Sequence, residues 1–256
     1  MASVVAITNQ KGGVGKTTTA VNLAASLAVA EQRVLLIDID PQGNATSGVG
    51  LSPRAVQPGT YDVLVGRSTV KEAAQATDLP FLTILPSSAD LAAVEIEFVD
   101  LEDRAVRLKD AIDSVRSDYD FILIDCPPSL GLLTLNALAA SHSVLVPMQC
   151  EYYALEGISH LMNTIERVRS GLNPSLYVHG VLLTMYDPRS NLANQVAGEL
   201  REHFHVYETV IPRNIRLAEA PSHGKPVILY DAGSKGSQGY LSLAREILDR
   251  LPEAAA

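Results

Sequence analysis

The sequence predicts one doubly wound α/β domain, in which a single, mostly parallel sheet carries helices on both faces. Short runs of Val, Ile and Leu alternate with longer amphipathic stretches along the 256 residues, which is typical of βαβ units with right-handed crossovers. The apolar runs also lack alternating polar residues, as strands buried on both faces do. Because no repeat, low-complexity block or Pro/Ser-rich linker divides the chain, residues 1–256 are expected to form one domain.

The expected strands are the short apolar runs, and the expected helices are the longer stretches between them. Strands are predicted over residues 4–8, 33–38, 81–85, 121–125, 143–147, 178–184 and 227–230. Helices are predicted over residues 15–30, 101–115, 131–139, 155–170, 192–203 and 238–251. Sheets of this class bind ligands outside the carboxyl ends of their strands, so functional side chains are expected just after each strand.

The composition limits the class of protein. With 47% hydrophobic and 19% charged residues, the chain does not resemble a disordered one. Its net charge of −9 argues against a surface coated with positive charge, so a nucleic acid would have to meet a local patch. Two cysteines cannot form a disulfide framework, and the N-terminus lacks the long apolar stretch of a signal peptide. We therefore expect a cytoplasmic protein.

Two segments have apolar features that could suit contact with a membrane. The stretch from Cys126 to Cys150 carries no Asp, Glu, Lys or Arg, but Pro127, Pro128 and Pro147 interrupt it. It is therefore expected to form a loop, a helix and a buried strand. The last predicted helix has apolar residues at helical spacing and few basic residues on its polar face, which favours packing on the domain over lying on a membrane.

The turn after the first strand has the composition of a phosphate-binding loop. It contains Lys11, Gly12, Gly13, Val14, Gly15, Lys16, Thr17 and Thr18, and it runs directly into a predicted helix. Glycines allow backbone N–H groups to converge on phosphate oxygens, and the helix N-terminus adds partial positive charge. Lys16 is expected to contact the β- and γ-phosphates, and the Thr17 hydroxyl is expected to bind Mg²⁺. Gln10 stands where the usual G-x-x-x-x-G-K-[ST] signature has its first glycine.

Two further predicted strands end in aspartate. Asp38 and Asp40 follow the second strand, and Asp125 ends the strand over residues 121–125. A carboxylate beside a phosphate loop can hold Mg²⁺ directly or through its water shell. Asp125 and Asp40 fit this role in magnesium binding, and Asp38 is a further candidate for it. Asp40 also fits a second role, in which it orients or deprotonates an attacking water. The alternative for each is an ordinary loop or helix-capping residue, and it weighs most for Asp38.

The loop over residues 11–17 resembles the deviant Walker A motif of the ParA/MinD group of P-loop ATPases. Residues 38–44, 182–191 and 211–226 resemble segments of the ParA/Soj chromosome- and plasmid-partitioning ATPases, so the resemblance spans residues 2 to about 250. It implies a P-loop NTPase fold, ATP and Mg²⁺ as cofactors, and ATP hydrolysis. It also implies that Lys11 reaches the nucleotide of a second subunit, and that a side chain at Gly12 would obstruct that subunit.

The resemblance further implies contacts to the base and to DNA. Pro212 and Asn214 are the candidates for adenine contact. Arg189 and Arg216 are the candidates for a DNA-binding surface, and Lys225 and Lys235 are added because they fall on predicted loops or element ends. The alternative is a set of solvated cations mixed with acidic residues. No helix-turn-helix extension precedes residue 1, so DNA binding is expected to be sequence-independent and weakened by salt.

The function implied is a nucleotide switch for DNA segregation. Mg·ATP would drive sandwich dimerisation and binding to double-stranded DNA on the nucleoid. Hydrolysis, stimulated by a DNA-bound partner similar to ParB or Spo0J, would release the dimer. Two alternatives stay open: a MinD-like positioning ATPase that associates with membranes, and a metabolic ATP-dependent enzyme of the same superfamily.

Overall fold

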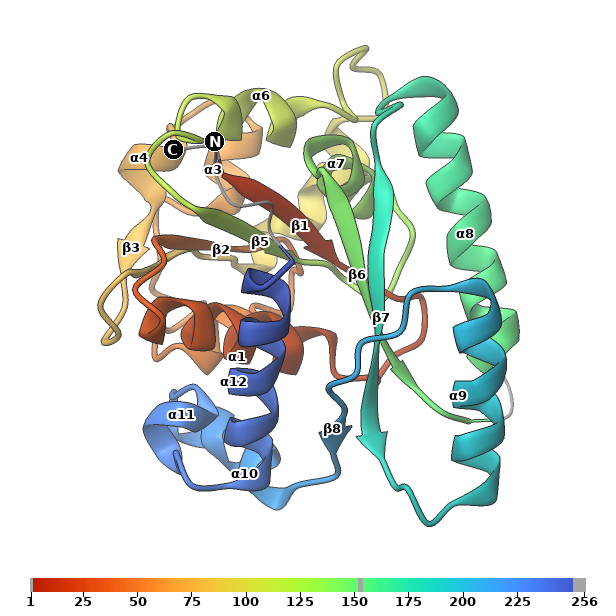
Figure 1. The fold of residues 1–256 in the computed structure, drawn as a ribbon. Helices are drawn as coiled ribbons and strands as arrows, with labels where there is room; N and C mark the ends of the chain where they lie inside the picture. The colour runs from red at the N-terminus through yellow and green to blue at the C-terminus, as the bar shows by residue number, and fades with distance from the viewer. Residues whose placement is uncertain (1, 152–153, 251–256) are drawn as a thin grey trace, which may run out of the picture.

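The structure, a computed structural model, describes residues 2–151 and 154–250 (Figure 1). An eight-stranded sheet with the order β3-β4-β2-β5-β1-β6-β7-β8 forms its centre, and every pair is parallel except β3–β4. The strands are β1 (Ser3–Ile7), β2 (Val34–Asp38), β3 (Gln75–Ala76), β4 (Leu82–Leu85), β5 (Phe121–Asp125), β6 (Ser143–Gln149), β7 (Tyr177–Tyr186) and β8 (Ile211–Pro212). The doubly wound fold class is confirmed.

Helices cover both faces of the sheet (Figure 1). The longer ones are α1 (Lys16–Val29), α6 (Arg107–Asp113), α7 (Leu132–Ala140), α8 (Ala154–Gly171), α9 (Asn191–His203) and α12 (Lys235–Leu248). The shorter ones are α2 (Asn44–Gly48), α3 (Thr60–Leu64), α4 (Val70–Ala73), η1 (Ala89–Ala93), α5 (Val94–Glu97), α10 (Ile215–Glu219), η2 (Ala220–His223) and α11 (Val227–Tyr230). Within the described residues, no helix is both long and apolar enough to cross a membrane.

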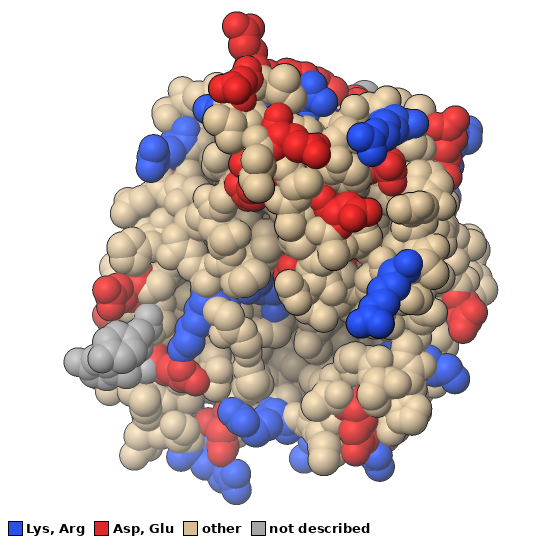
Figure 2. All heavy atoms as spheres, turned by 180° about the vertical axis from the view of Figure 1, so that it is seen from behind, with Lys and Arg blue, Asp and Glu red and all other residues tan. Residues whose placement is uncertain are grey.

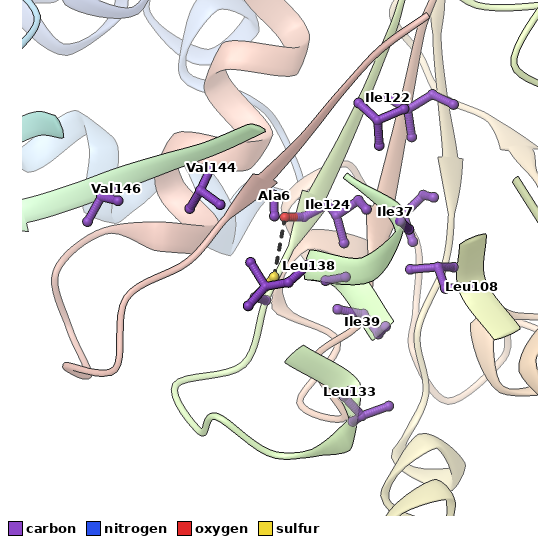
Figure 3. Close-up of a cluster of buried hydrophobic side chains, with 14 of the residues drawn as sticks. Ala6, Ile37, Ile39, Leu108, Ile122, Ile124, Leu133, Leu138, Val144 and Val146 are labelled. Carbon is purple, nitrogen blue, oxygen red and sulfur yellow. Dashed lines mark hydrogen bonds between the residues drawn. The ribbon is translucent and has the colours of Figure 1, made fainter. Parts of the chain in front are cut away.

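Successive residues of the central strands enter two separate cores. In β1, Val4 and Ala6 pack against the side that carries α6 to α9, whereas Val5 and Ile7 pack against α1 and α12. Figure 3 shows the first of these cores, in which Ile37, Ile122 and Ile124 from neighbouring strands meet Leu133 and Leu138 of α7. Because both faces are apolar, the strand sequences lack polar alternation, which is the feature that predicted a buried parallel sheet.

The structure corrects the predicted sheet at its carboxyl-terminal edge. Residues 227–230 were expected to form a strand, but they form the helical turn α11. The Val227 N–H donates to the Asn22 side chain of α1 at 2.7 Å, and the Val227 carbonyl accepts from the Asp231 N–H at 2.7 Å, which closes the turn. A run of four apolar residues fits a strand or a buried turn equally well. The eighth strand is Ile211–Pro212, which the sequence did not predict.

Other predicted elements differ mainly at their ends. The helix expected over residues 101–115 begins only at Arg107, because residues 102–106 form turns before it. The last helix was expected over residues 238–251, but it begins at Lys235 and ends at Leu248, because residues 249–250 form a turn; residue 251 lies outside the described residues. The stretch from Cys126 to Cys150 forms a loop, α7 and β6, in agreement with its prediction as a loop, a helix and a buried strand.

One histidine gives folding a pH dependence that can be tested. The Nδ1 atom of His142 accepts a hydrogen bond from the Val4 N–H at 3.0 Å. Burial, together with the nearby Arg116 charge, lowers the pKa of His142 below its usual 6.5. The unfolded chain therefore takes up this proton first as the pH falls, so the stability that His142 contributes is complete above pH 6.5 and is lost below it.

We expect a His142→Asn variant to show a weaker loss of stability between pH 7 and pH 5 than the wild type. The Asn Oδ1 can accept from Val4 at every pH, so the difference should approach the value of one hydrogen bond, about 1 kcal/mol. Urea denaturation of both proteins at each pH measures it, and comparing the two removes the contributions of other titrating groups. Parallel pH curves would show that His142 is not the group responsible.

Candidate nucleotide-binding site

The loop between β1 and α1 has the backbone shape of an anion-binding turn. Gly13 and Gly15 adopt φ angles of 74° and 86°, a left-handed conformation that other residues rarely adopt. Gly15 directly precedes α1, so the N–H groups at the start of this helix and its dipole face the loop. No described atom lies within 4 Å of the position that a Cβ on Gly12 would occupy, so open space adjoins this residue.

Lys16 is the first residue of α1 and is only 7% exposed. Its ammonium donates a hydrogen bond to the Lys11 carbonyl oxygen at 3.1 Å. Burial lowers the pKa of Lys16, and the nearby Asp125 carboxylate is the main opposing influence. The ammonium is therefore held inside the loop, where phosphate oxygens could replace the single backbone carbonyl.

Asp38 and Asp125 face each other in register on the neighbouring strands β2 and β5. Asp38 is fully buried, and its oxygens accept hydrogen bonds from the Thr46 N–H at 2.8 Å, the Thr46 hydroxyl at 2.7 Å and the Asp40 N–H at 3.2 Å. Burial raises its pKa to about 6 although these bonds oppose the shift. This arrangement favours the alternative role for Asp38, in which it anchors the loop into α2.

Asp125 has a different environment, although it is equally buried. Among the described residues, neither of its carboxylate oxygens has a hydrogen-bond partner. Burial and the Asp38 carboxylate raise its pKa well above the usual range, whereas the Thr17 hydroxyl and the Lys16 ammonium lower it. A buried carboxylate without partners is costly unless a cation compensates it.

These donors fit magnesium. Mg²⁺ usually takes one or two protein oxygens and completes its shell with phosphate and water oxygens. Asp125 and the neighbouring Thr17 hydroxyl could supply such oxygens beside the phosphate loop. The described part of the chain holds no group of three or more His, Cys, Asp or Glu side chains that could hold a metal ion.

Asp40 faces the same space from the segment that follows β2. It is 7% exposed, its carboxylate accepts a hydrogen bond from the Gln42 N–H at 3.0 Å, and its carbonyl accepts from the Ser87 hydroxyl at 2.7 Å. The backbone around Asp40 is therefore fixed while its side chain lines a cavity of about 340 Å³. That cavity is lined by Gly12, Gly13, Gly15, Lys16, Thr17, Thr18, Asp40, Gln42, Asn44 and Pro128.

A second cavity of about 430 Å³ adjoins the first, because Gly13, Gly15 and Thr18 line both. Its remaining walls are Thr184, Met185, Ile211, Pro212, Arg213, Asn214, Ile215, Leu217, Ala218 and Tyr240. The predicted base-contact residues Pro212 and Asn214 therefore lie beside the phosphate loop. The Asn214 Oδ1 accepts from the Arg216 N–H at 3.0 Å and caps α10, so its amide nitrogen is the atom left for a ligand.

Several residues that line these cavities were not predicted, among them Thr184, Met185 and Tyr240. Thr184 and Met185 come from the end of β7, and Tyr240 comes from α12, where its hydroxyl lies 3.1 Å from the Thr19 hydroxyl of α1. Met185 has a φ of 48°, an uncommon conformation that marks an irregularity in the pairing of β7 with β8. A polar residue at the carboxyl end of a buried strand was the available signal for Thr184.

Lys11 lies outside the linings of both cavities. Its ammonium forms an ion pair with Glu151, which follows β6, and its backbone N–H donates to the Asn9 side chain at 3.1 Å. Within one chain, Lys11 thus points away from the nucleotide space, whereas Gly12 and Gly13 border it.

The four candidate DNA contacts are all exposed. Arg189 follows β7 and is 88% exposed, but Asp187 holds its guanidinium through two hydrogen bonds of 3.0 Å. These bonds lower the pKa of Asp187 to about 2. Arg216 pairs with Glu219 at 2.8 Å and Asp231 at 3.2 Å. Lys225 and Lys235 come from the segments before α11 and at the start of α12.

Figure 2 shows how charge is distributed on one face of the molecule. Acidic side chains gather toward the top of this face, and basic side chains surround a hollow in its lower half. The two signs are mixed near the lower edge of this face. Wherever a polyanion binds Arg189, it would have to displace the Asp187 carboxylate from the guanidinium.

The fold and the loop define a class. A left-handed glycine loop joins a buried parallel strand to a helix N-terminus, and a buried lysine lies within it. The neighbouring strand β5 ends in Asp125, whose carboxylate has no hydrogen-bond partner in the described part of the chain. This arrangement is that of a P-loop nucleoside triphosphatase.

Known proteins narrow the class. The AAA domain family matches residues 2–178. The chain is 57% identical to the sporulation initiation inhibitor protein Soj of Bacillus subtilis, covering 96% of this chain and 98% of that protein. It is 54% identical to the chromosome partitioning protein ParA of Myxococcus xanthus, covering 96% and 88%. The protein therefore belongs to the ParA/Soj family of chromosome-partitioning ATPases.

A solved structure agrees in fold. The cobyrinic acid a,c-diamide synthase of Mycobacterium smegmatis, crystallised with ADP and magnesium, superposes with a TM-score of 0.85 at 36% identity. The match covers 97% of this chain and 94% of that one, so the likeness in fold extends over nearly the full length of both.

Proposed function

We propose that this protein is an ATP-dependent switch in DNA segregation. Mg·ATP binding drives two chains into a sandwich dimer that binds double-stranded DNA without sequence preference. Hydrolysis of ATP to ADP and phosphate, stimulated by a DNA-bound partner similar to ParB or Spo0J, releases the dimer. The protein would act in the cytoplasm on the nucleoid and would need no membrane.

The observation that carries the nucleotide part is the continuity of the two cavities. One is mostly apolar and offers few polar groups, as pockets for a nucleotide base do, and the other contains Lys16, Thr17 and Asp40. The glycines that separate them would lie under the sugar and the phosphates. A nucleoside triphosphate with magnesium is the ligand that matches both halves and would compensate the buried Asp125 carboxylate.

Phosphoryl transfer depends mostly on positioning and electrostatics, and each residue has a defined part. Lys16 and the amides of the loop would bind the phosphates, and Thr17 with Asp125 would hold the magnesium. When bound, Mg²⁺ neutralises charge on the phosphate oxygens. Asp40 would orient or deprotonate the attacking water, because its carboxylate lines the phosphate cavity without entering the loop.

Dimerisation is supported by the outer surface of the loop. Gly12 has open space around it, so a second chain could approach the backbone closely there. Lys11 is 39% exposed and is held by the partly exposed Glu151. Exposed ion pairs contribute little free energy, so Lys11 could leave Glu151 for the phosphates of the opposite nucleotide at small cost.

DNA binding is the part of the proposal that rests on charge. The monomer has a net charge of −9, so its average field repels DNA. A dimer would carry the region of Arg189 and Arg216 twice. Two sets of phosphate contacts would bind one DNA duplex more tightly than a single set. Binding should therefore appear only in the nucleotide state that dimerises.

We expect an Arg189→Glu variant to lose most of its DNA retention while ATP-dependent dimerisation is preserved. Removing one phosphate contact per chain and adding repulsion should weaken binding about tenfold or more at low salt. DNA retention on an immobilised duplex and light scattering measure the two properties. The matched control is Arg169→Glu, because Arg169 also pairs with an acidic residue but lies at the end of α8. Retention equal to that of the control would show that Arg189 does not belong to the DNA-binding surface.

The two alternatives predict different partners. A membrane-associated ATPase should sediment with anionic liposomes when ATP is bound. In the described chain, Tyr240, Leu243 and Ile247 of α12 are buried against the core that contains α1, which does not favour a membrane role for this helix. A metabolic enzyme should instead show turnover that a small-molecule acceptor accelerates without DNA or a partner protein.

A further inference from the structure

Thr184 connects the two halves of the candidate site. It lies near the end of β7, is 2% exposed, and lines the larger cavity. Its hydroxyl donates a hydrogen bond to the Val14 carbonyl oxygen at 2.8 Å, and its methyl group lies 3.8 Å from where a Cβ on Gly15 would be. One side chain therefore binds the phosphate loop by a hydrogen bond at Val14 and lies on the side of Gly15 where a Cβ would be.

The hydrogen bond fixes a group that Thr184 does not touch. The Val14 carbonyl and the Gly15 N–H belong to one planar trans peptide unit, in which the C=O and N–H bonds point in opposite directions. Holding the carbonyl toward Thr184 therefore holds the Gly15 N–H away from β7. Gly15 lines the phosphate cavity as well as the base cavity that Thr184 lines, so an N–H held away from β7 can serve the phosphates.

The conformation of the loop at Val14 gives the side-chain bond a purpose. Gly13 and Gly15 flank Val14 in left-handed conformations, and glycines have more accessible backbone states than other residues. Without a partner for its carbonyl, the Val14–Gly15 peptide unit could rotate and turn its N–H out of the cavity.

We propose that Thr184 is a positioning residue, which orients the Gly15 amide for phosphate binding from the wall of the base cavity. The proposal rests on the proposed function, since it assumes that a nucleotide occupies both cavities. It extends that function because it assigns to a side chain 170 residues from Val14 the task of shaping the phosphate loop.

The test compares ligands with and without phosphates. In a Thr184→Val variant, which keeps the side-chain shape, ADP should bind about tenfold more weakly, the size expected for one lost hydrogen bond. Adenosine, measured by ligand-observed NMR, should bind as it does to the wild type. Thr184→Ser keeps the hydroxyl and should restore ADP binding. Thr164→Val is the matched control, because that hydroxyl also donates to a backbone carbonyl but lies on α8.

The outcomes separate this proposal from the function on which it depends. Unchanged ADP affinity in Thr184→Val would overturn it, and so would equal losses for ADP and adenosine, since that pattern marks general damage to the cavity. Thermal melting without nucleotide checks that each variant is folded. If the Val variant does not fold, the Thr184→Ala and Thr184→Ser pair makes the same comparison. Failure of the wild type to bind ADP would refute the proposed function and this proposal together.

Discussion

A Lys16→Ala variant should lose ATP binding, with an affinity at least about 100-fold below that of the wild type. The ammonium is buried in the loop, and within one chain its hydrogen-bond partner is a single backbone carbonyl. A triphosphate would replace that neutral acceptor with charged oxygens, so the interaction would be strongest in the complex.

Isothermal titration calorimetry with Mg·ATP measures the effect. Lys71→Ala, an exposed lysine on α4, is the matched control and should bind as the wild type does. Thermal melting distinguishes loss of binding from loss of folding. Wild-type affinity in a folded Lys16→Ala protein would mean that the loop between β1 and α1 does not hold the phosphates.

An Asp40→Ala variant should separate binding from hydrolysis. Turnover should fall by about 100-fold or more, which is the usual contribution of a general base. ATP affinity should change little, because Asp40 contacts the Gln42 backbone and not the glycine loop. The variant should therefore accumulate as an ATP-bound dimer, since the step that ends this state is blocked.

Phosphate release and light scattering at saturating Mg·ATP test both halves of this expectation. Asp118→Ala changes an exposed aspartate in the turn that precedes β5, at the opposite end of the strand from Asp125, and should leave both properties unchanged. Normal turnover would exclude Asp40 as the residue that acts on water. A variant that binds ATP but stays monomeric would show instead that Asp40 is needed to form the dimer.

The parts of the site that could be predicted are local in sequence. The glycine loop is a short stretch of the sequence, and so is the strand that ends in Asp125. The spacing of Lys16 from the glycines is enough to predict phosphate binding. The topology of a doubly wound sheet then brings the strand ends to one edge, so Asp38 and Asp125 were expected near the loop, as their register shows.

The parts that could not be predicted depend on contacts between distant segments. Whether Asp38 or Asp125 keeps free oxygens is decided by Thr46, whose backbone N–H and hydroxyl both donate to the Asp38 carboxylate. The Thr184 bond to Val14 and the Tyr240 contact with Thr19 join residues 170 and 221 positions apart. The strand prediction for residues 227–230 was wrong for a related reason, because the Val227 N–H donates to the distant Asn22 side chain of α1.

We propose that the bound nucleotide controls DNA binding, and retention of the wild-type protein on a DNA duplex is the direct test. The protein is applied with ATP, with ADP or without nucleotide, across a series of salt concentrations. We expect retention with ATP alone, and the logarithm of the affinity should fall linearly with the logarithm of the salt concentration. Equal retention in all three states, or none with ATP at the lowest salt, would contradict it.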